Sequence, residues 1–320
     1  MLEAIIFVLC GLGLLAFGAD RFVDGALSLS VRFRISPMIV GVVVVGFATS
    51  APELLVSTIA ALESHPTLSI GNAIGSNIAN IGLVLGVTAL VFPLQIKTSL
   101  LKIEFPIMLA GLLLSSLLML DLNIGLVDGF LFLVGLLFLL SLMVFLNGNA
   151  EDESFDKDKS FILDQEKEVR IWRAFFLFLG GLVLLLIGSE MLVKGAVLLA
   201  KYFGATDVFI GLTIVAVGTS LPELAASLAS AFKKATDLAI GNIIGSNLFN
   251  ALGVVAMPAL FHPFSVDITI LQRDVGVMWL LTLLLLLAII ISRKKGKLDR
   301  LPGLIFLLSF IFYQITLFFG

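Results

Sequence analysis

The feature that most constrains this chain is a polar motif that occurs twice, each time inside a segment that is otherwise apolar. Residues 46–53 read GFATSAPE, and residues 216–223 read AVGTSLPE. The second copy follows the first at a spacing of 170 residues, and the same register holds without a gap across residues 18–80. The chain is therefore built from two related halves.

The composition places these halves in a membrane. Of 320 residues, 59% are hydrophobic and 13% are charged, and the mean hydropathy is +1.15, which is too apolar for a soluble domain. The single cysteine, Cys10, allows no internal disulfide and no cysteine-based zinc site. We expect a polytopic membrane protein surrounded by lipid, with no cofactor and no nucleic-acid partner. The sequence does not define an oligomeric state.

Apolar segments long enough to cross a bilayer recur along the chain. A span needs about 20 apolar residues, and on that basis the sequence predicts ten transmembrane helices, at 3–30, 37–62, 68–92, 103–120, 124–146, 173–200, 207–231, 237–260, 274–292 and 301–319. Five helices then separate corresponding points of the two halves. Because an odd number of crossings inverts the second half, the predicted fold is all-α, with two inverted five-helix repeats of the kind found in secondary transporters.

Polar segments divide the chain and orient it. The long polar segment at 148–172 is rich in acidic residues and is predicted to link a first repeat at 1–147 to a second repeat at 173–320. Basic residues gather in alternate loops, namely Arg32 and Arg34, Lys97 and Lys102, Lys233 and Lys234, and the cluster between 293 and 300. Because basic loops face the cytoplasm, we expect a cytoplasmic linker, both termini outside, and a location in the inner or plasma membrane of the cell.

Each copy of the motif places an ionisable glutamate after a proline at membrane depth. A charged side chain at the bilayer centre costs about 2.5 to 3.5 kcal/mol on insertion scales, so such residues usually face a cavity and mark an ion path. Pro52 cannot donate a backbone hydrogen bond to Ala48, so the helix must break or kink, and Pro222 has the same effect at Gly218. Paired interruptions in two halves indicate a transporter's binding site.

Hydroxyl groups share the helix face of each glutamate. Thr49 and Ser50 lie four and three residues before Glu53, and Thr219 and Ser220 repeat the arrangement in the second half. Carboxylate, hydroxyl and carbonyl oxygens suit Ca2+ or Na+ better than a soft metal. A kink whose polar groups only satisfy one another is the simpler interpretation, but it explains two copies in register less well.

A second repeated motif opens the helix after each glutamate. Residues 71–80 read GNAIGSNIAN and residues 241–250 read GNIIGSNLFN, and their glycines, four residues apart, permit close helix approach. Four amides are interpreted as groups that join helices by hydrogen bonds: Asn72, Asn77, Asn242 and Asn247. Four further side chains lie deeper in the membrane, where their oxygens could complete a cage around the glutamates: Ser76, Asn80, Ser246 and Asn250.

The paired motifs, Thr-Ser-x-Pro-Glu followed by Gly-Asn-x-x-Gly-Ser-Asn-x-x-Asn, resemble the α-repeats of the cation/calcium exchanger superfamily, especially prokaryotic Na+/Ca2+ exchangers. The first copy departs from the family pattern in having Phe47 and Ala48 where glycine is usual before threonine. The resemblance covers nearly the whole chain. It implies a fold in which the second, third, seventh and eighth helices form the ion-binding core while the first and sixth slide across it.

The resemblance also implies a role for each matching residue. Glu53 and Glu223 become shared ligands of Ca2+ and Na+, with Thr49 and Thr219 contacting Ca2+ through their backbone carbonyls. The implied Na+ ligands are Ser50, Ser76, Ser220 and Ser246, helped by the carbonyls of Gly46 and Ala216. Asn80 and Asn250 become the middle polar pair, where some relatives carry aspartate.

The expected function is antiport of Ca2+ against Na+ by alternating access at a mid-membrane site. Relatives that also carry K+ tend to have an acidic residue at the middle pair, so Asn80 and Asn250 argue against the K+-dependent alternative. Exchange of Ca2+ for H+ stays open, since it needs only that a buried glutamate takes up a proton.

The sequence leaves three other classes of function to consider. A passive cation channel would need a continuous polar pore. An intramembrane hydrolase has little support, because His65 and His262 lie at predicted loop ends and the sequence contains neither H-E-x-x-H nor G-x-S-x-G; we expect no enzyme. A membrane scaffold would leave the repeated glutamates unexplained.

Overall fold

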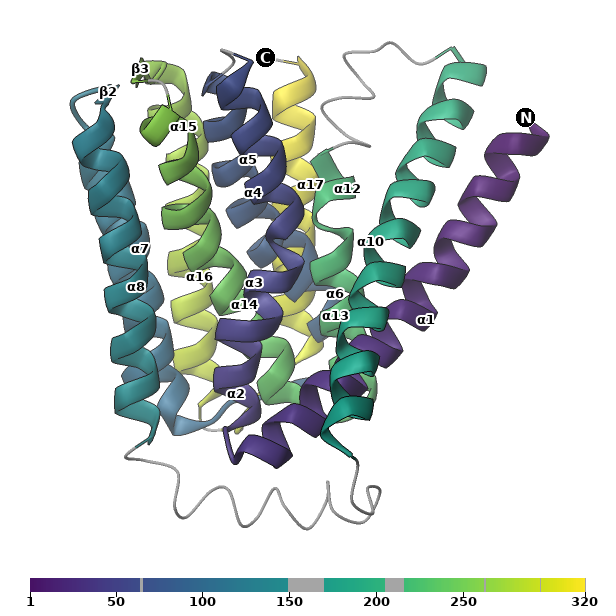
Figure 1. The fold of residues 1–320 in the computed structure, drawn as a ribbon. Coiled ribbons are helices and arrows are strands. Elements are labelled where there is room, and N and C mark those ends of the chain that lie inside the picture. Colours follow the sequence, from purple (N-terminus) through teal and green to yellow (C-terminus); the bar gives the residue numbers. More distant parts are fainter. Residues whose placement is uncertain (64–65, 149–169, 205–215, 262, 294, 320) are drawn as a thin grey trace.

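Helices form almost the whole of the described molecule (Figure 1). The computed structural model describes residues 1–63, 66–148, 170–204, 216–261, 263–293 and 295–319. The first half contains α1 (Leu2–Phe33), α2 (Pro37–Ile39), α3 (Gly46–Thr49), α4 (Ala51–Leu62), α5 (Pro66–Ala79), α6 (Gly86–Val91), α7 (Phe105–Leu118) and α8 (Leu126–Gly148). The second half contains α10 (Ile171–Tyr202), α12 (Ala216–Thr219), α13 (Leu221–Phe232), α14 (Thr236–Leu248), α15 (Val255–Phe261), α16 (Gly276–Ser292) and α17 (Arg300–Phe319).

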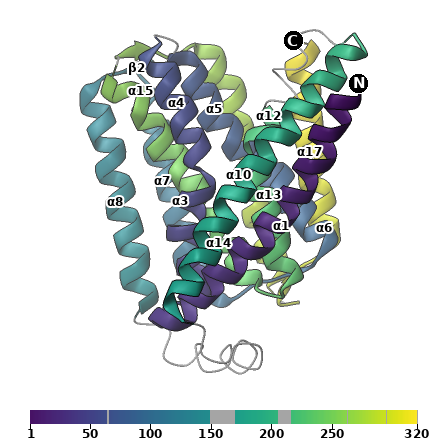
Figure 2. The ribbon, with the colours of Figure 1, turned by 45° about the vertical axis from the view of Figure 1, so that its right-hand side comes forward.

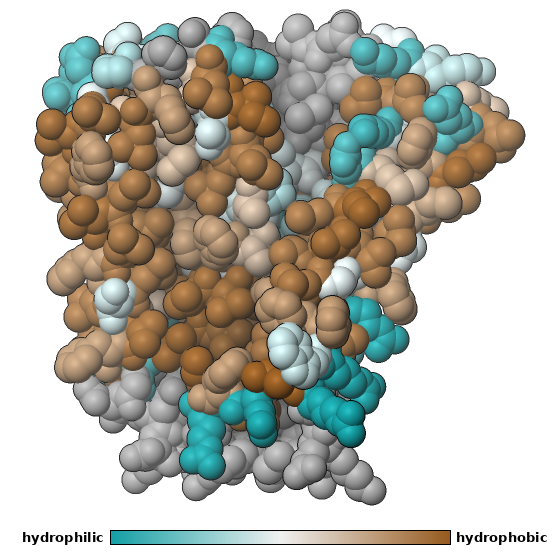
Figure 3. Space-filling view, viewed as in Figure 1, coloured by the Kyte–Doolittle hydropathy of each residue, from teal (hydrophilic) through white to brown (hydrophobic). Residues whose placement is uncertain are grey.

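The lengths and apolarity of these helices confirm a multi-pass membrane fold. Among the described residues, 8 helical segments are long and apolar enough to cross a membrane, and a bent helix pair raises the number to 9. The seventh predicted span, 207–231, falls partly on residues 205–215, outside the described part of the chain, and is represented there by α12 and α13. In Figure 3 apolar side chains cover a broad band of the surface, with polar side chains gathered toward its two ends.

The helix breaks predicted at the two prolines are confirmed. The segments 37–49 and 51–62 meet at a bend of 42°. Ser50 at this bend has φ −82° and ψ 3°, and Ser220 in the second half has nearly the same conformation, φ −89° and ψ 4°. Each proline lies in the first turn of the following helix, where its missing N–H leaves no bond unmade. The two halves therefore break in the same way.

Wide π-helical turns accompany the motifs. Val40–Val45 leads into α3, Asn80–Leu85 follows α5, and Phe249–Val254 follows α14. Two more, Leu100–Glu104 and Ile270–Val275, open α7 and α16. Single π turns inside α-helices are frequent at functional sites, and two of these turns contain Asn80 and Asn250.

The two longest helices, α1 and α10, form an arm beside the rest of the molecule (Figures 1 and 2). Glycines spaced seven residues apart line their contact: Gly11, Gly18 and Gly25 on α1, and Gly181, Gly188 and Gly195 on α10. A Cβ atom at Gly11 would lie 2.5 Å from the backbone nitrogen of Leu192, and one at Gly195 would lie 2.8 Å from the carbonyl oxygen of Ala4. The helices run antiparallel with their backbones in contact, which makes the arm rigid.

Two very short strand pairs join the halves and qualify the all-α prediction. β1 (Leu94–Gln95) pairs antiparallel with β4 (Lys297–Leu298), and β2 (Asn123–Ile124) pairs with β3 (Phe264–Ser265). Each pair takes one strand from each half, so the loops of the two repeats are tied together.

The two ends of the helical bundle are distinguished by the parts of the chain that lie there. In Figure 1 α1 begins and α17 ends at the top, which we call the termini end. At the opposite end, the linker end, α8 finishes and α10 starts. The predicted linker therefore connects the halves at the linker end, and most of it, 149–169, lies outside the described residues.

Candidate cation-binding site

Two glutamates lie buried at the helix breaks. Glu53 is in the first turn of α4 and Glu223 is in the first turn of α13, where a helix N-terminus favours negative charge. Their exposed fractions are 0% and 1%. The Ser50 hydroxyl, three residues before Glu53, donates a hydrogen bond to Glu223 Oε1 at 3.3 Å. A hydroxyl of the first half thus reaches the carboxylate of the second half, and the two buried carboxylates lie close enough to interact electrostatically.

A hydroxyl and amide network joins the first break to α14. The Thr49 hydroxyl donates to Asn242 Oδ1 at 3.0 Å and lies 3.3 Å from the Ser246 hydroxyl. All three side chains are fully buried. Close packing brings these groups together, because a Cβ atom at Gly241 would lie 2.5 Å from the carbonyl oxygen of Met38. The glycines of the second motif thus bring α14 against the broken helix of the other half.

Asn72 and Asn242 make the helix-joining bonds that the sequence predicts. Asn72 Nδ2 donates to the Glu53 carbonyl oxygen at 3.3 Å and to Ser57 Oγ at 3.1 Å. In the second half, Asn242 Nδ2 donates to the Glu223 carbonyl oxygen and to a serine hydroxyl, at 3.2 and 3.0 Å. Each amide thus fixes the backbone that carries a glutamate, a supporting role that the sequence analysis gave to the amides without naming their partners.

The other two asparagines behave differently. Asn247 Nδ2 donates to the Ile243 carbonyl at 2.7 Å. Both residues lie on α14, so the prediction that Asn247 joins two helices is wrong for this hydrogen bond. Asn77 Nδ2 approaches the sulfur of Met278 on α16 at 3.7 Å, which is a contact between helices. The reason for the difference is that the backbone carbonyl four residues back competes for a buried amide in a helix.

Polar atoms without partners concentrate at the predicted site. Buried polar groups are normally hydrogen-bonded, yet within the described residues several site atoms have no partner: both carboxylate oxygens of Glu53, Oε2 of Glu223, Oγ of Ser220, and both amide atoms of Asn80 and of Asn250. The oxygens in this group are hard donors of the kind that bind Ca2+ and Na+. The donor set therefore fits a dehydrated cation.

The remaining predicted residues take varied positions. Ser76 on α5 is buried at 4% exposure, and Thr219 is half-buried at the break between α12 and α13. The Gly46 carbonyl oxygen already accepts a hydrogen bond from the Ser50 N–H at 3.1 Å and faces the Thr49 hydroxyl at 3.4 Å. Ala216 is the first described residue of α12.

A cavity of about 640 Å³ reaches the break from the side of the arm. It lies between α4, α10 and the α12–α13 break, and its lining includes Ala51, Pro52, Thr219 and Pro222. The cavity thus comes within one residue of each glutamate in sequence.

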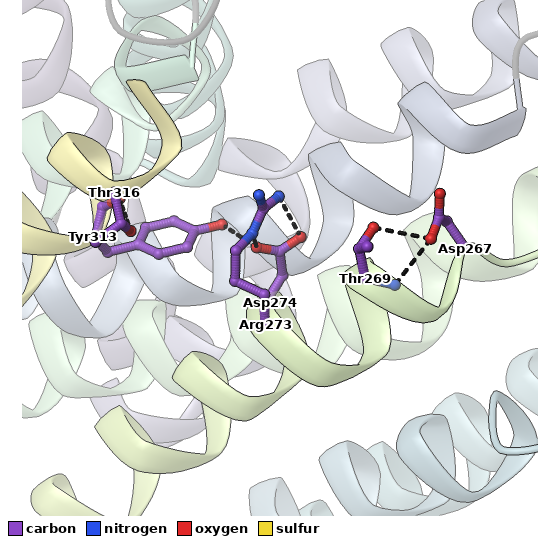
Figure 4. Close-up of polar contacts among 6 residues, drawn as sticks. All are labelled: Asp267, Thr269, Arg273, Asp274, Tyr313 and Thr316. Carbon is purple, nitrogen blue, oxygen red and sulfur yellow. Dashed lines mark hydrogen bonds and ion pairs between the residues drawn. The ribbon is translucent and has the colours of Figure 1, made fainter. Parts of the chain in front are cut away.

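A second acidic pair, Glu104 and Asp274, has the same 170-residue spacing and was not predicted from the sequence. Asp274 is buried and accepts hydrogen bonds from Arg273 Nε at 2.8 Å and from the Tyr313 hydroxyl at 3.0 Å (Figure 4). Its counterpart Glu104 is 1% exposed, and its carboxylate faces Ser99 and Asn147 with no well-formed hydrogen bond among the described residues. The repeat register itself was the signal that could have identified the pair.

Taken together, the apolar spans and the buried, cation-suited donors define a multi-pass membrane protein with a candidate cation site between its two halves. A family model described as sodium/calcium exchanger protein matches residues 3–146 and 173–319. The chain belongs to the sodium/calcium exchanger family of antiporters. The predicted superfamily is confirmed, and the chain is a member of a transporter family.

Named relatives cover almost the whole chain. The putative antiporter CaxA of Alkalimonas amylolytica is 44% identical over 99% of both chains. The sodium/calcium exchanger MaX1 of Methanosarcina acetivorans is 30% identical over 98% of both. A structure of the sodium-calcium exchanger NCX_Mj soaked with zero Na+ and Ca2+ is 31% identical, covers 99% of both chains and superposes with a TM-score of 0.82. Other crystals of that exchanger were soaked with Na+ and Ca2+ or Sr2+.

Proposed function

We propose that this chain exchanges Ca2+ for Na+ at a single mid-membrane site built on Glu53 and Glu223, seen alternately from the two sides. The observation that carries the proposal is the burial of both carboxylates with most of their oxygens unpartnered among the described residues. NCX_Mj, whose fold this chain shares, is named a sodium-calcium exchanger, which supports Na+ and Ca2+ as the ions.

Charge explains why the exchange is obligatory. With asparagine at positions 80 and 250, the two glutamates supply the formal charge of the core, which one Ca2+ or several Na+ neutralise. An ion-free core would expose two negative charges to the apolar surface of the moving arm, at a cost of about 2.5 to 3.5 kcal/mol for each charge on insertion scales. Only a neutralised core lets the arm pass, so the protein exchanges ions and does not leak them.

The proposed ligands follow from the donor set. Glu53 and Glu223 bind either ion, and the backbone carbonyls of Thr49 and Thr219 contact Ca2+. Na+ takes hydroxyl oxygens from Ser50, Ser76, Ser220 and Ser246, with the carbonyls of Gly46 and Ala216, and Asn80 and Asn250 form the middle pair. The unpartnered atoms at Ser220, Asn80 and Asn250 support this assignment.

The proposed setting is a cell membrane, inner or plasma, crossed ten times by two inverted repeats. The basic loops favour a cytoplasmic linker end with both termini outside. The arm of α1 and α10 would move across the core to expose the site to either side. The rigid backbone contact between its two helices supports movement as one body.

Gradient-driven uptake tests the proposal. Purified protein in proteoliposomes is given an outward Na+, K+ or H+ gradient, one at a time, and uptake of 45Ca is measured. We expect uptake with Na+ alone. Uptake driven by H+ identifies a Ca2+/H+ exchanger, a K+ requirement identifies the K+-dependent class, and downhill flux independent of any trans cation identifies a channel.

Substitution of the glutamates tests the site. Glu53→Gln and Glu223→Gln keep the shape of the side chain and remove its charge, so each should abolish Na+-driven uptake while the protein still folds. Glu3→Gln, at an exposed position on α1, serves as the matched control and should leave uptake unchanged. Wild-type exchange in either buried variant would contradict the assignment.

A further inference from the structure

An ion triad ties the arm to a broken helix at the linker end. Lys233, directly after α13, contacts Asp20 and Asp24 of α1 at 2.7 and 2.6 Å. Arg21 adds longer contacts to the same carboxylates, at 3.9 and 3.8 Å. Burial lowers the pKa of Lys233, but its hydrogen bonds to Asp20 and Asp24 outweigh that effect and raise the pKa, so the lysine stays charged. We call Asp20, Asp24 and Lys233 the linker-end triad.

The repeat register defines a second triad at the termini end. The positions 170 residues away are Glu190 and Lys194 on α10, and Glu63, directly after α4. Each triad contains two acids and one base, although the base has moved from the end of the short helix to the long helix. Either triad can therefore close in the same way, with one lysine between two carboxylates. We call Glu63, Glu190 and Lys194 the mirror triad.

The mirror triad is not assembled in this structure. Lys194 pairs with Glu190 on its own helix, and their side chains are 60% and 66% exposed. Within the described residues, Glu63 makes no ion pair. The cavity of about 640 Å³ lies between α10 and α4, where the mirror triad would form, whereas α1 packs directly on α13 at the linker end. One triad is closed while the other is apart.

The geometry points to a pair of alternating latches: the linker-end triad holds the linker end shut, and Lys194 bridges Glu63 and Glu190 when the termini end shuts. This inference rests on the proposed function, because it assumes that the arm moves between two positions. Since α1 and α10 are in backbone contact, a shift that separates Lys233 from α1 also carries Lys194 toward α4. A contact made in only one of two states shifts their balance by the energy that it contributes in that state.

Cysteine labelling tests the latches without any transport. In a Cys10→Ser background, one reporter is Leu55→Cys, at a cavity position 63% exposed, and the other is Ala225→Cys, its partner in the repeat register, partly buried and packed against the cluster that includes α1. Rates of reaction with a hydrophilic maleimide are measured on the full chain in detergent, which removes any dependence on orientation.

We expect Lys233→Ala to slow labelling of Leu55→Cys and speed labelling of Ala225→Cys several-fold, because the linker end opens and the termini end shuts. Lys233→Arg should retain the original rates, and the combined Lys233→Asp, Asp20→Lys and Asp24→Lys exchange of charge should restore them. Glu63→Ala should neither slow labelling of Leu55→Cys nor speed labelling of Ala225→Cys. If Lys233→Ala does not fold, Asp20→Asn with Asp24→Asn carries the same test.

Unchanged rates at both reporters in Lys233→Ala and in the paired aspartate variant would overturn the latches. The outcome is separable from that of the proposed function, since labelling requires no ion exchange. A shift of the two rates in protein that fails to exchange Ca2+ for Na+ would support the latches and count against the proposed function alone.

Discussion

The two ends of this molecule are made from matching sequence and yet are packed differently. At the linker end, Phe22 and Val23 of α1 are fully buried. The residues that correspond to them on α10, Leu192 and Val193, are only half-buried, and Val193 lines the large cavity. All four side chains are apolar, so composition does not explain the contrast. The difference lies in which end of the arm is packed against the core.

A second comparison concerns the centre of the molecule. Asn72 and Asn242 occupy matching positions and make matching bonds to the backbone of a glutamate and to a serine. Asn242 also accepts a bond from Thr49 of the other half. The repeat therefore duplicates the bonds that fix the backbone of each glutamate, and the bond from Thr49 to Asn242 links one half to the other.

The largest loss of stability and exchange is expected from a substitution that forces α1 and α10 apart. Gly188 lies in backbone contact with Leu15, and Gly180, on the same helix, has nothing within 4 Å of where its Cβ would be. Gly188→Leu should destabilise the protein by about 1 to 3 kcal/mol or more through overpacking and should abolish exchange. Gly180→Leu should leave both unchanged. The measurements are the midpoint of thermal unfolding in detergent and uptake of 45Ca; equal behaviour of the two variants would refute the rigid arm.

An intermediate loss of stability is expected from replacing Asn72 or Asn242. Asn242→Ala and Asn72→Ala each remove the bonds that hold the backbone of a glutamate. Asn242 is fully buried whereas Asn72 is half-buried, and a buried partner left without a hydrogen bond costs about 1 to 3 kcal/mol, so Asn242→Ala should be the more destabilising by about 1 kcal/mol. Because the loss of Asn242 also frees the Thr49 hydroxyl at the break, Asn242→Ala should weaken the apparent affinity for Ca2+ as well. A larger loss of unfolding midpoint and affinity in Asn72→Ala would reverse this ranking.

Substitutions in the second acidic pair should change stability by less, and the two members of the pair should differ in the direction of the change. Asp274 is held by Arg273, whose side chain is 46% exposed, so Asp274→Asn should cost about 1 kcal/mol after allowance for solvent screening. Glu104 has no basic partner among the described residues, and a buried charge without one is unfavourable. Glu104→Gln should therefore leave stability unchanged or raise it. The midpoint of thermal unfolding is measured for the two variants side by side. A midpoint lowered as much by Glu104→Gln as by Asp274→Asn would contradict the contrast.

The local features of the site were easier to predict from the sequence than the contacts between its residues. Pro52 and Pro222 dictate a break wherever they occur in a helix, so both breaks and the positions of Glu53 and Glu223 beside them were predictable. The bonds from Asn72 and Asn242 followed from polar groups placed at membrane depth. Ends of spans differed by a few residues, because π turns and frayed helix ends leave little trace in hydropathy.

Contacts between distant segments were not predictable in this way. Lys233 was interpreted as a basic loop residue, and its pairing with Asp20 and Asp24 depends on where the arm lies. The strand pairs are two residues long, too short for an alternating pattern. Glu104 and Asp274 share the register of the glutamates, but nothing in their local sequence indicates that one has a basic partner and the other does not.

The central claim, that Glu53 and Glu223 together hold one cation, is tested most directly by equilibrium binding of 45Ca to the purified protein in Na+-free detergent solution. The account predicts one Ca2+ bound per chain, displaced by added Na+, and lost equally in Glu53→Gln and Glu223→Gln. Retention of full Ca2+ binding in either folded variant would contradict it.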